Sequence, residues 1–179
     1  MKNILLVVDV QNGFINSYTE NTKNKIVKLL ESNIFDIVIA TKFKNNEGSN
    51  FEKILKWNKL KNEKEQEIVK DIEKYLDFII EKDGYSGYTN DMINILKSIN
   101  NNLSDKVYIV GFDTDGCVLA TVFDLFEDGI RPIILADYCA STGGDEYNNA
   151  GIKVLQRLIG KNNIVLNKNI TKNFIENLK

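Results

Sequence analysis

The stretch Ile4-Leu5-Leu6-Val7-Val8-Asp9 determines how the rest of the chain is interpreted. Its five consecutive apolar residues lack the polar alternation of a half-exposed strand, which indicates a strand buried on both faces of a parallel sheet. The run is too short for a signal peptide or for a membrane span, which needs about 20 apolar residues. It ends directly at a carboxylate, so we expect Asp9 to lie at the carboxyl end of a buried strand.

Similar apolar runs recur along the chain and alternate with helical patterns. Further strands are predicted at residues 37–40, 78–80, 107–110, 133–135 and 164–166. Helices are predicted at residues 24–31, 89–99, 117–128, 150–159 and 171–178. This alternation predicts an α/β fold in a single domain, with three α/β/α layers around a six-stranded, mostly parallel, doubly wound (Rossmann-like) sheet. Ligands of such sheets bind beyond the carboxyl ends of the strands.

The chain has 179 residues, of which 43% are hydrophobic and 27% charged, and this suits one compact domain over residues 1–179. An irregular or helical insertion at about residues 42–75 interrupts the alternation. Apolar spacing over residues 68–76 predicts an amphipathic helix in its second half. The first half, which contains Trp57, is interpreted as a short helix or a cover over one end of the sheet. Two interpretations of the insertion stay open: a substrate lid, and a solvated excursion with a hydrophobic anchor.

Histidine is absent from the sequence, which excludes Ser-His-Asp and Cys-His catalysis, histidine phosphotransfer and histidine zinc sites. There are 23 basic against 25 acidic residues, and Arg131 and Arg157 are the only arginines. Because arginine is the preferred phosphate-binding residue, we expect no nucleic-acid partner. We also expect no membrane partner and predict a cytoplasmic protein. Cys117 and Cys139 are too few for a disulfide framework, and Cys139 is interpreted as a packed thiol.

Three polar residues are predicted to lie at one edge of the sheet, where strands end or a helix begins. Asp9 follows the first strand, Lys82 closes the third, and Cys117 opens the helix after the fourth. Because parallel strands end at a common edge, we expect these side chains to converge. A thiol reacts as its thiolate, which a helix N-terminus and the Lys82 ammonium would stabilise. Asp9 would take the thiol proton and return it to a leaving amine, so the set supplies a base, an electrostatic stabiliser and a nucleophile.

Each of these residues also has an ordinary structural interpretation. A lone cysteine is usually a small buried hydrophobe, an aspartate at a strand end often caps it, and a lysine is usually solvated. The pocket assignment is similarly open. Phe14, Tyr85, Tyr88 and Phe112 flank the three polar residues in sequence, and Trp57 would close from the insertion. These aromatic residues would either stack on a small planar amide or fill the core.

Four blocks of sequence follow one another between positions 7 and 141. They are VVDVQNGF (7–14), EKDGYSGY (81–88), VGFDTDGCV (110–118) followed by AT (120–121), and ADYCAS (136–141). In this order they resemble the isochorismatase-like cysteine hydrolases, a family that includes nicotinamidases, N-carbamoylsarcosine amidohydrolases and ureidoacrylate amidohydrolases. One block alone has low specificity, whereas the ordered set has high specificity and covers most of the chain.

The resemblance implies that Asp9, Lys82 and Cys117 form a triad. Such a triad would cleave a C–N bond of a small amide, imide or carbamoyl compound through a thioester-type intermediate. The resemblance also implies a non-proline cis peptide at Phe112-Asp113, and an oxyanion hole made by the N–H groups of Asp113 and Cys117. Because relatives are commonly dimers or tetramers, we expect a homo-oligomer.

One segment departs from the family pattern. Nicotinamidases bind a metal through an Asp-x-His element and a second His after the second strand, whereas this chain reads ATKFKNN at residues 40–46. The resemblance therefore points to a metal-free branch without a cofactor, and it argues against nicotinamidase activity. A binding or regulatory module that keeps the fold without turnover stays an alternative. Phosphate chemistry from Asp9 is disfavoured, because Gln11 stands where a second Asp is needed and no glycine-rich phosphate loop occurs.

Overall fold

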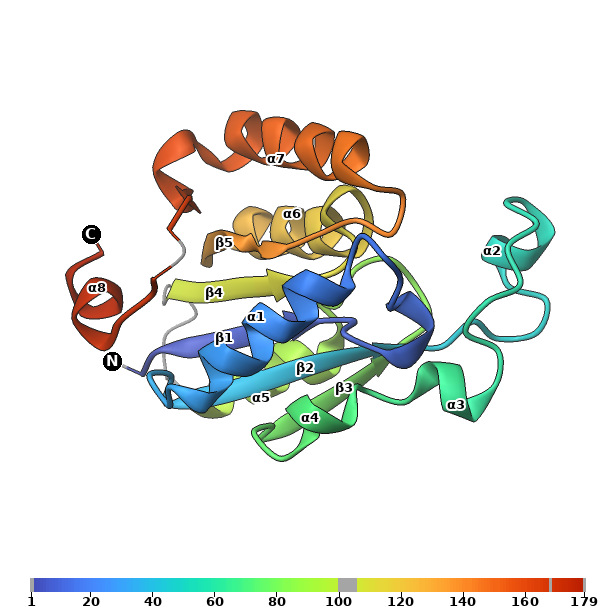
Figure 1. Cartoon of the computed structure of the whole chain (residues 1–179), viewed down its shortest axis with the longest axis horizontal. Coiled ribbons are helices and arrows are strands. Elements are labelled where there is room, and N and C mark those ends of the chain that lie inside the picture. Colours follow the sequence, from blue (N-terminus) through green and yellow to red (C-terminus); the bar gives the residue numbers. More distant parts are fainter. Residues whose placement is uncertain (1, 100–105, 168, 179) are drawn as a thin grey trace.

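A six-stranded parallel sheet forms the centre of the molecule. The computed structural model describes residues 2–99, 106–167 and 169–178. The strand order is β3-β2-β1-β4-β5-β6 (Figure 1). The strands are β1 (Ile4–Val8), β2 (Ile37–Phe43), β3 (Phe78–Lys82), β4 (Lys106–Gly111), β5 (Arg131–Cys139) and β6 (Ile164–Val165). The order reverses between β1 and β4, which is the point where doubly wound sheets bind ligands. The predicted fold class is confirmed.

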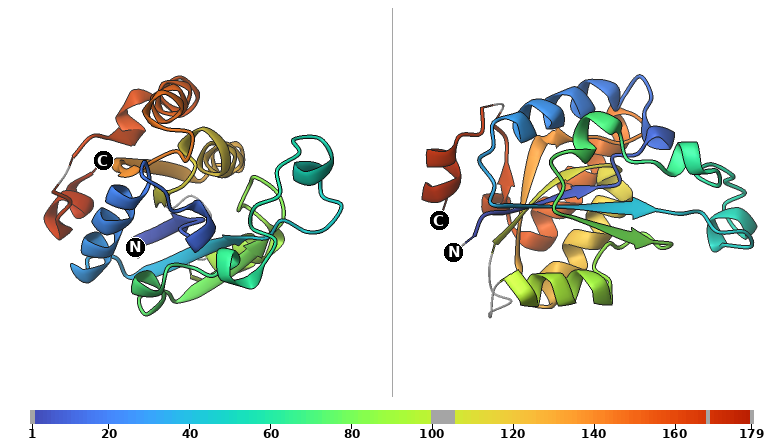
Figure 2. Two further views of the ribbon diagram at one scale, coloured as in Figure 1. Left: turned by 45° about the vertical axis from the view of Figure 1, so that its right-hand side comes forward. Right: turned by 90° about the horizontal axis from the view of Figure 1, so that it is seen from below.

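Helices cover both faces of this sheet. The α-helices in the described part of the chain are α1 (Glu20–Glu31), α2 (Asn50–Lys53), α3 (Glu63–Gln66), α4 (Lys70–Glu73), α5 (Asn90–Ile99), α6 (Leu119–Glu127), α7 (Asp145–Ile159) and α8 (Lys172–Asn177). Shorter turns are η1 (Asn12–Phe14), η2 (Thr114–Val118) and η3 (Lys161–Asn163). Figure 2 shows α1 and α5 on opposite sides of the sheet. None of the helices described is long and apolar enough to cross a bilayer.

Alternate residues of the central strands feed two separate cores. Leu5 and Val7 belong to the cluster that includes side chains of α1, α4 and α8, whereas Leu6 and Val8 belong to the cluster with α5, α6 and α7. Burial on both faces explains why β1 is apolar without interruption. At the end of β4, Gly111 has φ of 122°, and a Cβ there would lie 2.1 Å from the Val8 carbonyl oxygen. Glycine therefore permits β4 to approach β1 closely where the two strands end.

One predicted strand is less buried than expected. We expected residues 78–80 to be a buried strand, but β3 is the edge strand, and Phe78 and Ile79 are 37% and 46% exposed. β3 pairs with β2 from Phe78 opposite Ile39 to Lys82 opposite Phe43. This pairing explains why both strands extend beyond the ranges predicted from their apolar runs.

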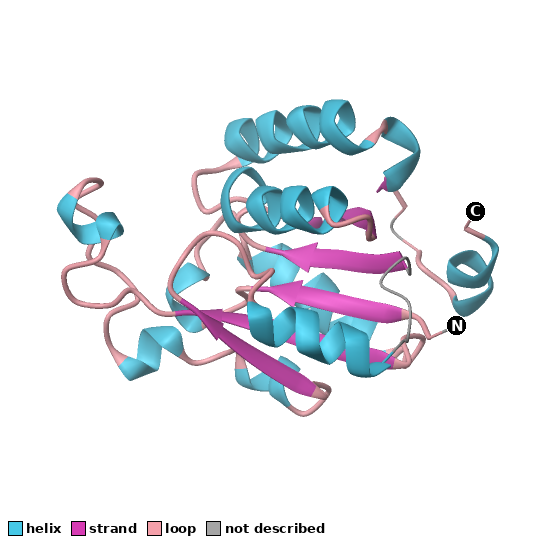
Figure 3. Ribbon diagram, turned by 180° about the vertical axis from the view of Figure 1, so that it is seen from behind, coloured by secondary structure: helices cyan, strands magenta, loops and turns pink. Residues whose placement is uncertain are grey.

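The insertion contains less helix than its sequence pattern suggests. The amphipathic helix predicted over residues 68–76 is wrong, because only the four residues of α4 are helical. Ile68 instead forms an antiparallel bridge with Gln11, and the Val69 N–H donates to the Val10 carbonyl. Residues 44–66, called the arm below, contain α2 and α3 and project beyond the carboxyl ends of the strands (Figure 3).

The segment that contains Cys117 also differs from expectation. The helix predicted over residues 117–128 is preceded by the π-helical turn η2, and Cys117 lies within this turn. Phe126, an apolar residue of this segment, is exposed. Cys139, expected just after a strand, is the last residue of β5, where its thiol donates to the Ile109 carbonyl.

Candidate active site

Asp9 follows β1 and is held by β2. Its backbone has φ of 49°, a left-handed conformation that aspartate tolerates better than most residues, and its side chain is fully buried. The Asp9 N–H donates to Thr41 Oγ1 (3.1 Å), and Thr41 Oγ1 donates to Asp9 Oδ1 (2.6 Å). This reciprocal pair fixes the carboxylate and turns Oδ2 toward Lys82.

Lys82, the last residue of β3, places its ammonium beside that carboxylate. Nζ lies 2.7 Å from Asp9 Oδ2 and donates to the carbonyl oxygens of Gly84 and Tyr85, each at 2.9 Å. The Phe43 ring centroid lies 5.1 Å from the same nitrogen. Burial alone would lower the pKa of Lys82, but interactions with Asp9 and Cys117, led by the negative charge of Asp9, outweigh it and raise the pKa. The ammonium is therefore protonated and has three oxygen partners for its three protons.

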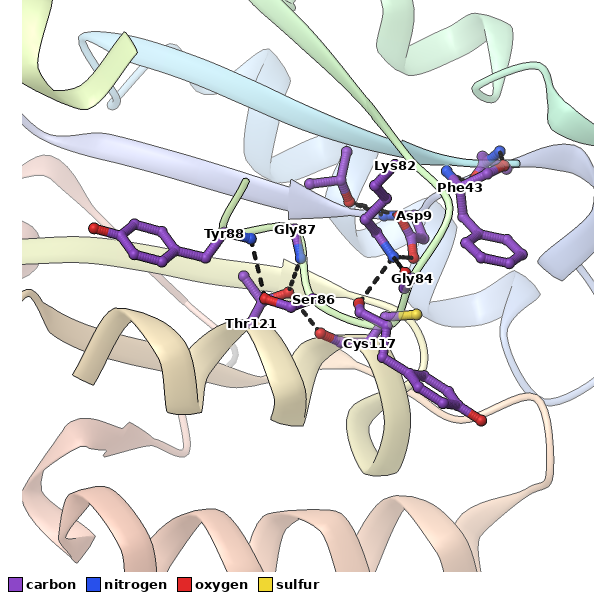
Figure 4. A network of polar contacts seen from close by, with 12 residues as sticks. Asp9, Phe43, Lys82, Gly84, Ser86, Gly87, Tyr88, Cys117 and Thr121 are labelled. Carbon is purple, nitrogen blue, oxygen red and sulfur yellow. Dashed lines mark hydrogen bonds and ion pairs between the residues drawn. The ribbon is translucent and has the colours of Figure 1, made fainter. Parts of the chain in front are cut away.

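Cys117 completes the group from the η2 turn. Figure 4 shows its sulfur near Asp9, Lys82 and Phe43. Burial, followed by the charge of Asp9, raises the pKa of the Cys117 thiol well above its usual value, although Lys82 acts in the opposite direction. Desolvation therefore favours the neutral thiol, so the proton that Asp9 is expected to accept is still on the sulfur. The Cys117 thiol interacts with the Asp9 carboxylate, whose Oδ1 is taken by Thr41 and whose Oδ2 is paired with Lys82, so Oδ2 is placed to accept the thiol proton.

Two buried threonines join the three segments that carry these groups. The Gly87 N–H donates to Thr121 Oγ1 (2.8 Å), and Thr121 Oγ1 donates to the Cys117 carbonyl (2.7 Å) (Figure 4). A Cβ on Gly87 would lie 2.5 Å from the Thr41 methyl group, so glycine lets the loop after β3 pass close to β2. Neither Thr41 nor Thr121 was predicted from the sequence as a site residue. The indication available in the sequence was a hydroxyl residue following the buried run of β2.

The peptide bond Phe112-Asp113 is cis, as the family resemblance implies. No described residue accepts a hydrogen bond from the Asp113 N–H. The Asp113 carboxylate accepts bonds from the N–H and the hydroxyl of Thr142, both at 2.7 Å. Burial raises the pKa of Asp113, and the two bonds from Thr142 oppose this shift. This arrangement leaves the Asp113 N–H available to a ligand, while its carboxylate is fixed by the loop after β5.

A cavity of about 270 Å³ opens beside Cys117. Its lining combines aromatic rings with Cys117 and the loop after β5, and consists of Phe14, Phe43, Phe51, Leu55, Trp57, Tyr85, Asp113, Gly116, Cys117 and Thr142. Of the predicted pocket residues, Phe14, Trp57 and Tyr85 line this cavity. Phe43, Phe51 and Leu55 were not predicted. Phe43 was missed because β2 extends to residue 43, three residues beyond its predicted end.

The structure places the other two predicted pocket residues elsewhere, so that assignment is wrong for both. Phe112 is fully buried in the core cluster on the α1 side of the sheet. Tyr88 packs against the opposite cluster, and its hydroxyl donates to Asp128. In both cases the side chain points to a core or a surface contact, although its neighbours in sequence reach the site.

Gln11 fixes the arm at both of its ends. Its buried side chain donates to the carbonyl oxygens of Phe43 (2.8 Å) and Gln66 (2.7 Å) and accepts from the Phe43 N–H (2.8 Å).

The end of β2 and the residues after it lack the histidine ligands that nicotinamidases carry in this segment. Lys42 and Lys44 lie 3.7 and 2.5 Å from the carboxylate of Glu81. Within the described ranges, no three His, Cys, Asp or Glu side chains are grouped to hold a metal ion. The residues therefore do not fit the metal site of nicotinamidases.

The family model and the curated relatives indicate one family. Residues 3–165 match the family model described as the isochorismatase domain. Isochorismatase family protein 2B of Dictyostelium discoideum is 33% identical over 98 residues, which is 51% of this chain and 45% of that protein. The match thus spans less than half of the relative's length.

Solved structures give the same result for the fold. An isochorismatase-like hydrolase from Alkaliphilus metalliredigens superposes with a TM-score of 0.77 at 20% identity, over 88% of this chain and 92% of that chain. The nicotinamidase PncA from Bacillus subtilis gives a TM-score of 0.75 at 21% identity, over 89% and 97% of the two chains. At this level of identity the two likenesses support the fold alone.

Proposed function

The chain belongs to the isochorismatase family of hydrolases, and from this premise we propose that it cleaves a C–N bond of a small amide, imide or carbamoyl compound through a covalent acyl-Cys117 intermediate. The observation that carries the proposal is the ion pair of Lys82 with Asp9 at 2.7 Å, next to a thiol that lines a cavity. No cofactor takes part in the proposed reaction.

The proposed reaction begins with the neutral thiol. Sγ of Cys117 attacks the carbonyl carbon while its proton passes to Asp9 Oδ2, and Lys82 stabilises the negative charge that develops on sulfur. When the tetrahedral intermediate collapses, the C–N bond breaks and Asp9 gives the proton to the departing nitrogen. A water molecule then attacks the thioester, and one of its protons returns through Asp9 to Sγ. One product is a carboxylic or carbamic acid, and the other is the departing nitrogen compound, which is ammonia or an amine from an amide or carbamoyl substrate and an amide from an imide.

The developing oxyanion is assigned to the N–H groups of Asp113 and Cys117. The Asp113 N–H supports this assignment, because no described residue accepts a bond from it. Removal of one such donor typically lowers the rate on the order of a hundredfold or more. The hydrolase assignment therefore depends on the backbone of the segment after β4 as well as on the three side chains.

The experiment that tests the proposal compares the two cysteines. Ammonia or amine release from small amides and carbamoyl compounds, and acid formation from imides, are measured for the wild type, Cys117→Ala and Cys139→Ala. We expect Cys117→Ala to lose activity by on the order of 10³-fold or more. Cys139→Ala should retain most of it, since Cys139 lies in the core and burial raises its pKa to about 12. Mass spectrometry of the wild type with a slow substrate should show an acyl adduct on Cys117.

Two outcomes would contradict the proposal. Undiminished hydrolysis by Cys117→Ala would remove Cys117 as the nucleophile. Binding of small amides without turnover of any of them would favour the binding or regulatory module. The homo-oligomeric state, the cytoplasmic location and the absence of nucleic-acid or membrane partners stay predictions.

A further inference from the structure

A second cavity adjoins the one at Cys117 and shares part of its wall. Its volume is about 620 Å³, and it has Phe51, Leu55 and Tyr85 in common with the inner cavity. We infer that the two cavities together select amides whose acyl group is aromatic or apolar and is either neutral or positively charged. They reject amides whose acyl group carries a carboxylate. This inference rests on the proposed function and specifies its substrate class.

Aromatic rings dominate the wall of the inner cavity. Phe14 and Trp57 are stacked, with ring centroids 6.1 Å apart and planes inclined by 21°. The Phe51 ring centroid lies 4.9 Å from the Phe43 ring centroid and 4.9 Å from the Tyr85 ring centroid. The face of an aromatic ring carries partial negative charge, so it attracts a cation within about 6 Å of its centroid and offers nothing to an anion. This wall suits planar, apolar and cationic groups.

The charged side chains that line the two cavities are acidic. Asp113 lines the inner cavity, and Glu47 and Asp83 line the outer one. Among the described lining residues there is no lysine or arginine. Burial raises the pKa of Tyr85, and the charges of Asp115 and Asp113 shift this pKa in the same direction. A substrate carboxylate would therefore enter a region that already carries charge of its own sign.

The nearby lysines do not reverse this balance. Lys82 has three oxygen partners, and its side chain is only 1% exposed. Lys44 and Lys61 each form an ion pair with a glutamate, at 2.5 and 2.6 Å. Lys53 is exposed, with its Nζ beside Gly48 at the rim of the outer cavity. A carboxylate in the inner cavity would therefore lose its hydration without gaining a cationic partner, which is costly.

Charge selection can be measured on Cys117 without any turnover. Two methanethiosulfonate reagents of similar size are used, one with a trimethylammonium group and one with a sulfonate group. The thiolate of Cys117 displaces methanesulfinate from either reagent and forms a mixed disulfide, which peptide mapping quantifies, with Cys117→Ala as the blank. Both rates are measured at one pH, and each is divided by the rate at which the same reagent modifies 2-mercaptoethanol. The ratio of the two corrected rates is then independent of the thiolate fraction of Cys117. We expect the cationic reagent to react about tenfold faster or more after this correction.

A charge-reversal pair separates the cavity from the net charge of the protein. Glu47→Lys should reduce the preference for the cationic reagent roughly threefold, because it places a cation on the outer cavity. Glu127→Lys makes the same charge change on an exposed residue at the far end of α6 and should leave the preference unchanged. Equal corrected rates for the two reagents, or equal losses in the two variants, would overturn the inference.

A matched amide series links this selection to the substrate. The compounds are 4-(aminomethyl)benzamide, 4-methylbenzamide and 4-carboxybenzamide, and kcat/KM is measured from ammonia release. We expect the cationic and neutral amides to exceed the carboxylate by about tenfold or more. If the carboxylate is the best substrate, the charge inference fails and the proposed function stands. If none of the three is hydrolysed although the thiosulfonate ratio favours the cation, the aromatic acyl group inferred for the substrate is overturned; the proposed function falls as well only if no member of the wider panel is hydrolysed.

Discussion

The two sides of the cavity at Cys117 are built in different ways. The sheet side consists of strand ends whose polar groups are fully buried and fixed by several partners, as for Asp9 and Lys82. The arm side consists of four-residue helices joined by turns, and its Ile54 and Leu55 are 71% and 57% exposed. The sheet supplies the groups assigned to reaction, whereas the arm supplies much of the wall around a substrate. We therefore expect substitutions on the sheet side to change kcat and those on the arm to change KM.

The largest effect is expected for Asp9→Asn, and it should have opposite signs in two assays. Amide hydrolysis should fall by roughly 10²- to 10⁴-fold, because the proton acceptor is lost. Alkylation of Cys117 by iodoacetamide should become faster at pH 8, because the Asp9 charge raises the pKa of Cys117 and its removal lowers that pKa. The two rates and the pH midpoint of alkylation are measured on the same preparation.

This substitution also leaves the Lys82 ammonium without its counter-charge in a buried position. The free energy of unfolding should therefore fall, and rates are compared at a temperature where circular dichroism shows the variant folded. A parallel loss of hydrolysis and alkylation in folded protein would show that Asp9 supports the site as a whole rather than transferring the proton.

A smaller effect is expected for Thr41→Val, which keeps the shape of the side chain and removes its hydroxyl. Without the bond to Oδ1 the carboxylate is less well oriented, and kcat should fall about tenfold with little change in KM. Thr41→Ser retains the hydroxyl and should restore most of the rate. If serine fails to do so while both variants have the wild-type thermal midpoint, the methyl packing against Gly87 is what matters.

On the arm, Trp57→Ala should act mainly on binding. Loss of the ring that stacks on Phe14 should raise KM roughly three- to tenfold and leave kcat within about a factor of two. Steady-state kinetics over a range of substrate concentrations separates the two parameters. A loss confined to kcat would mean that the arm positions the reacting atoms, and the contrast between the two sides would then disappear.

The smallest effect is expected for Ser49→Ala at the start of α2. The Ser49 hydroxyl accepts from the Glu52 N–H at 3.2 Å, and loss of such a cap costs about 1 kcal/mol locally. Because α2 projects from the sheet, the thermal midpoint should change little while KM rises about twofold. Hydrogen exchange at residues 50–54 should increase. An equal increase in the strands would mean that the arm and the sheet unfold together.

The sheet side was more predictable from the sequence than the arm side. Asp9, Lys82 and Cys117 could be placed at one edge because buried apolar runs mark strands, and parallel strands end together. Each position follows from local sequence and a general rule of topology. Their roles could be assigned as a hypothesis because the residue types form a complete set for proton transfer and attack.

The arm was less predictable because its conformation depends on distant partners. Gln11 fixes both ends of the arm through hydrogen bonds to Phe43 and Gln66, and no local pattern indicates this. The length of β2 follows from its pairing with β3, so Phe43 was not expected at the site. Residues 68–76, which follow the arm, have helical spacing, but Ile68 pairs with the segment after β1. Tertiary contacts thus override local propensity in each case.

The protonated sulfur of Cys117 also bears on how the protein withstands oxidants. Peroxides convert the thiolate to sulfenic acid, whereas a thiol that keeps its proton reacts slowly. A cysteine that is deprotonated only when a substrate is bound is therefore unreactive toward oxidants for most of the time. Resistance to oxidative inactivation would follow directly from the desolvation that keeps this sulfur neutral.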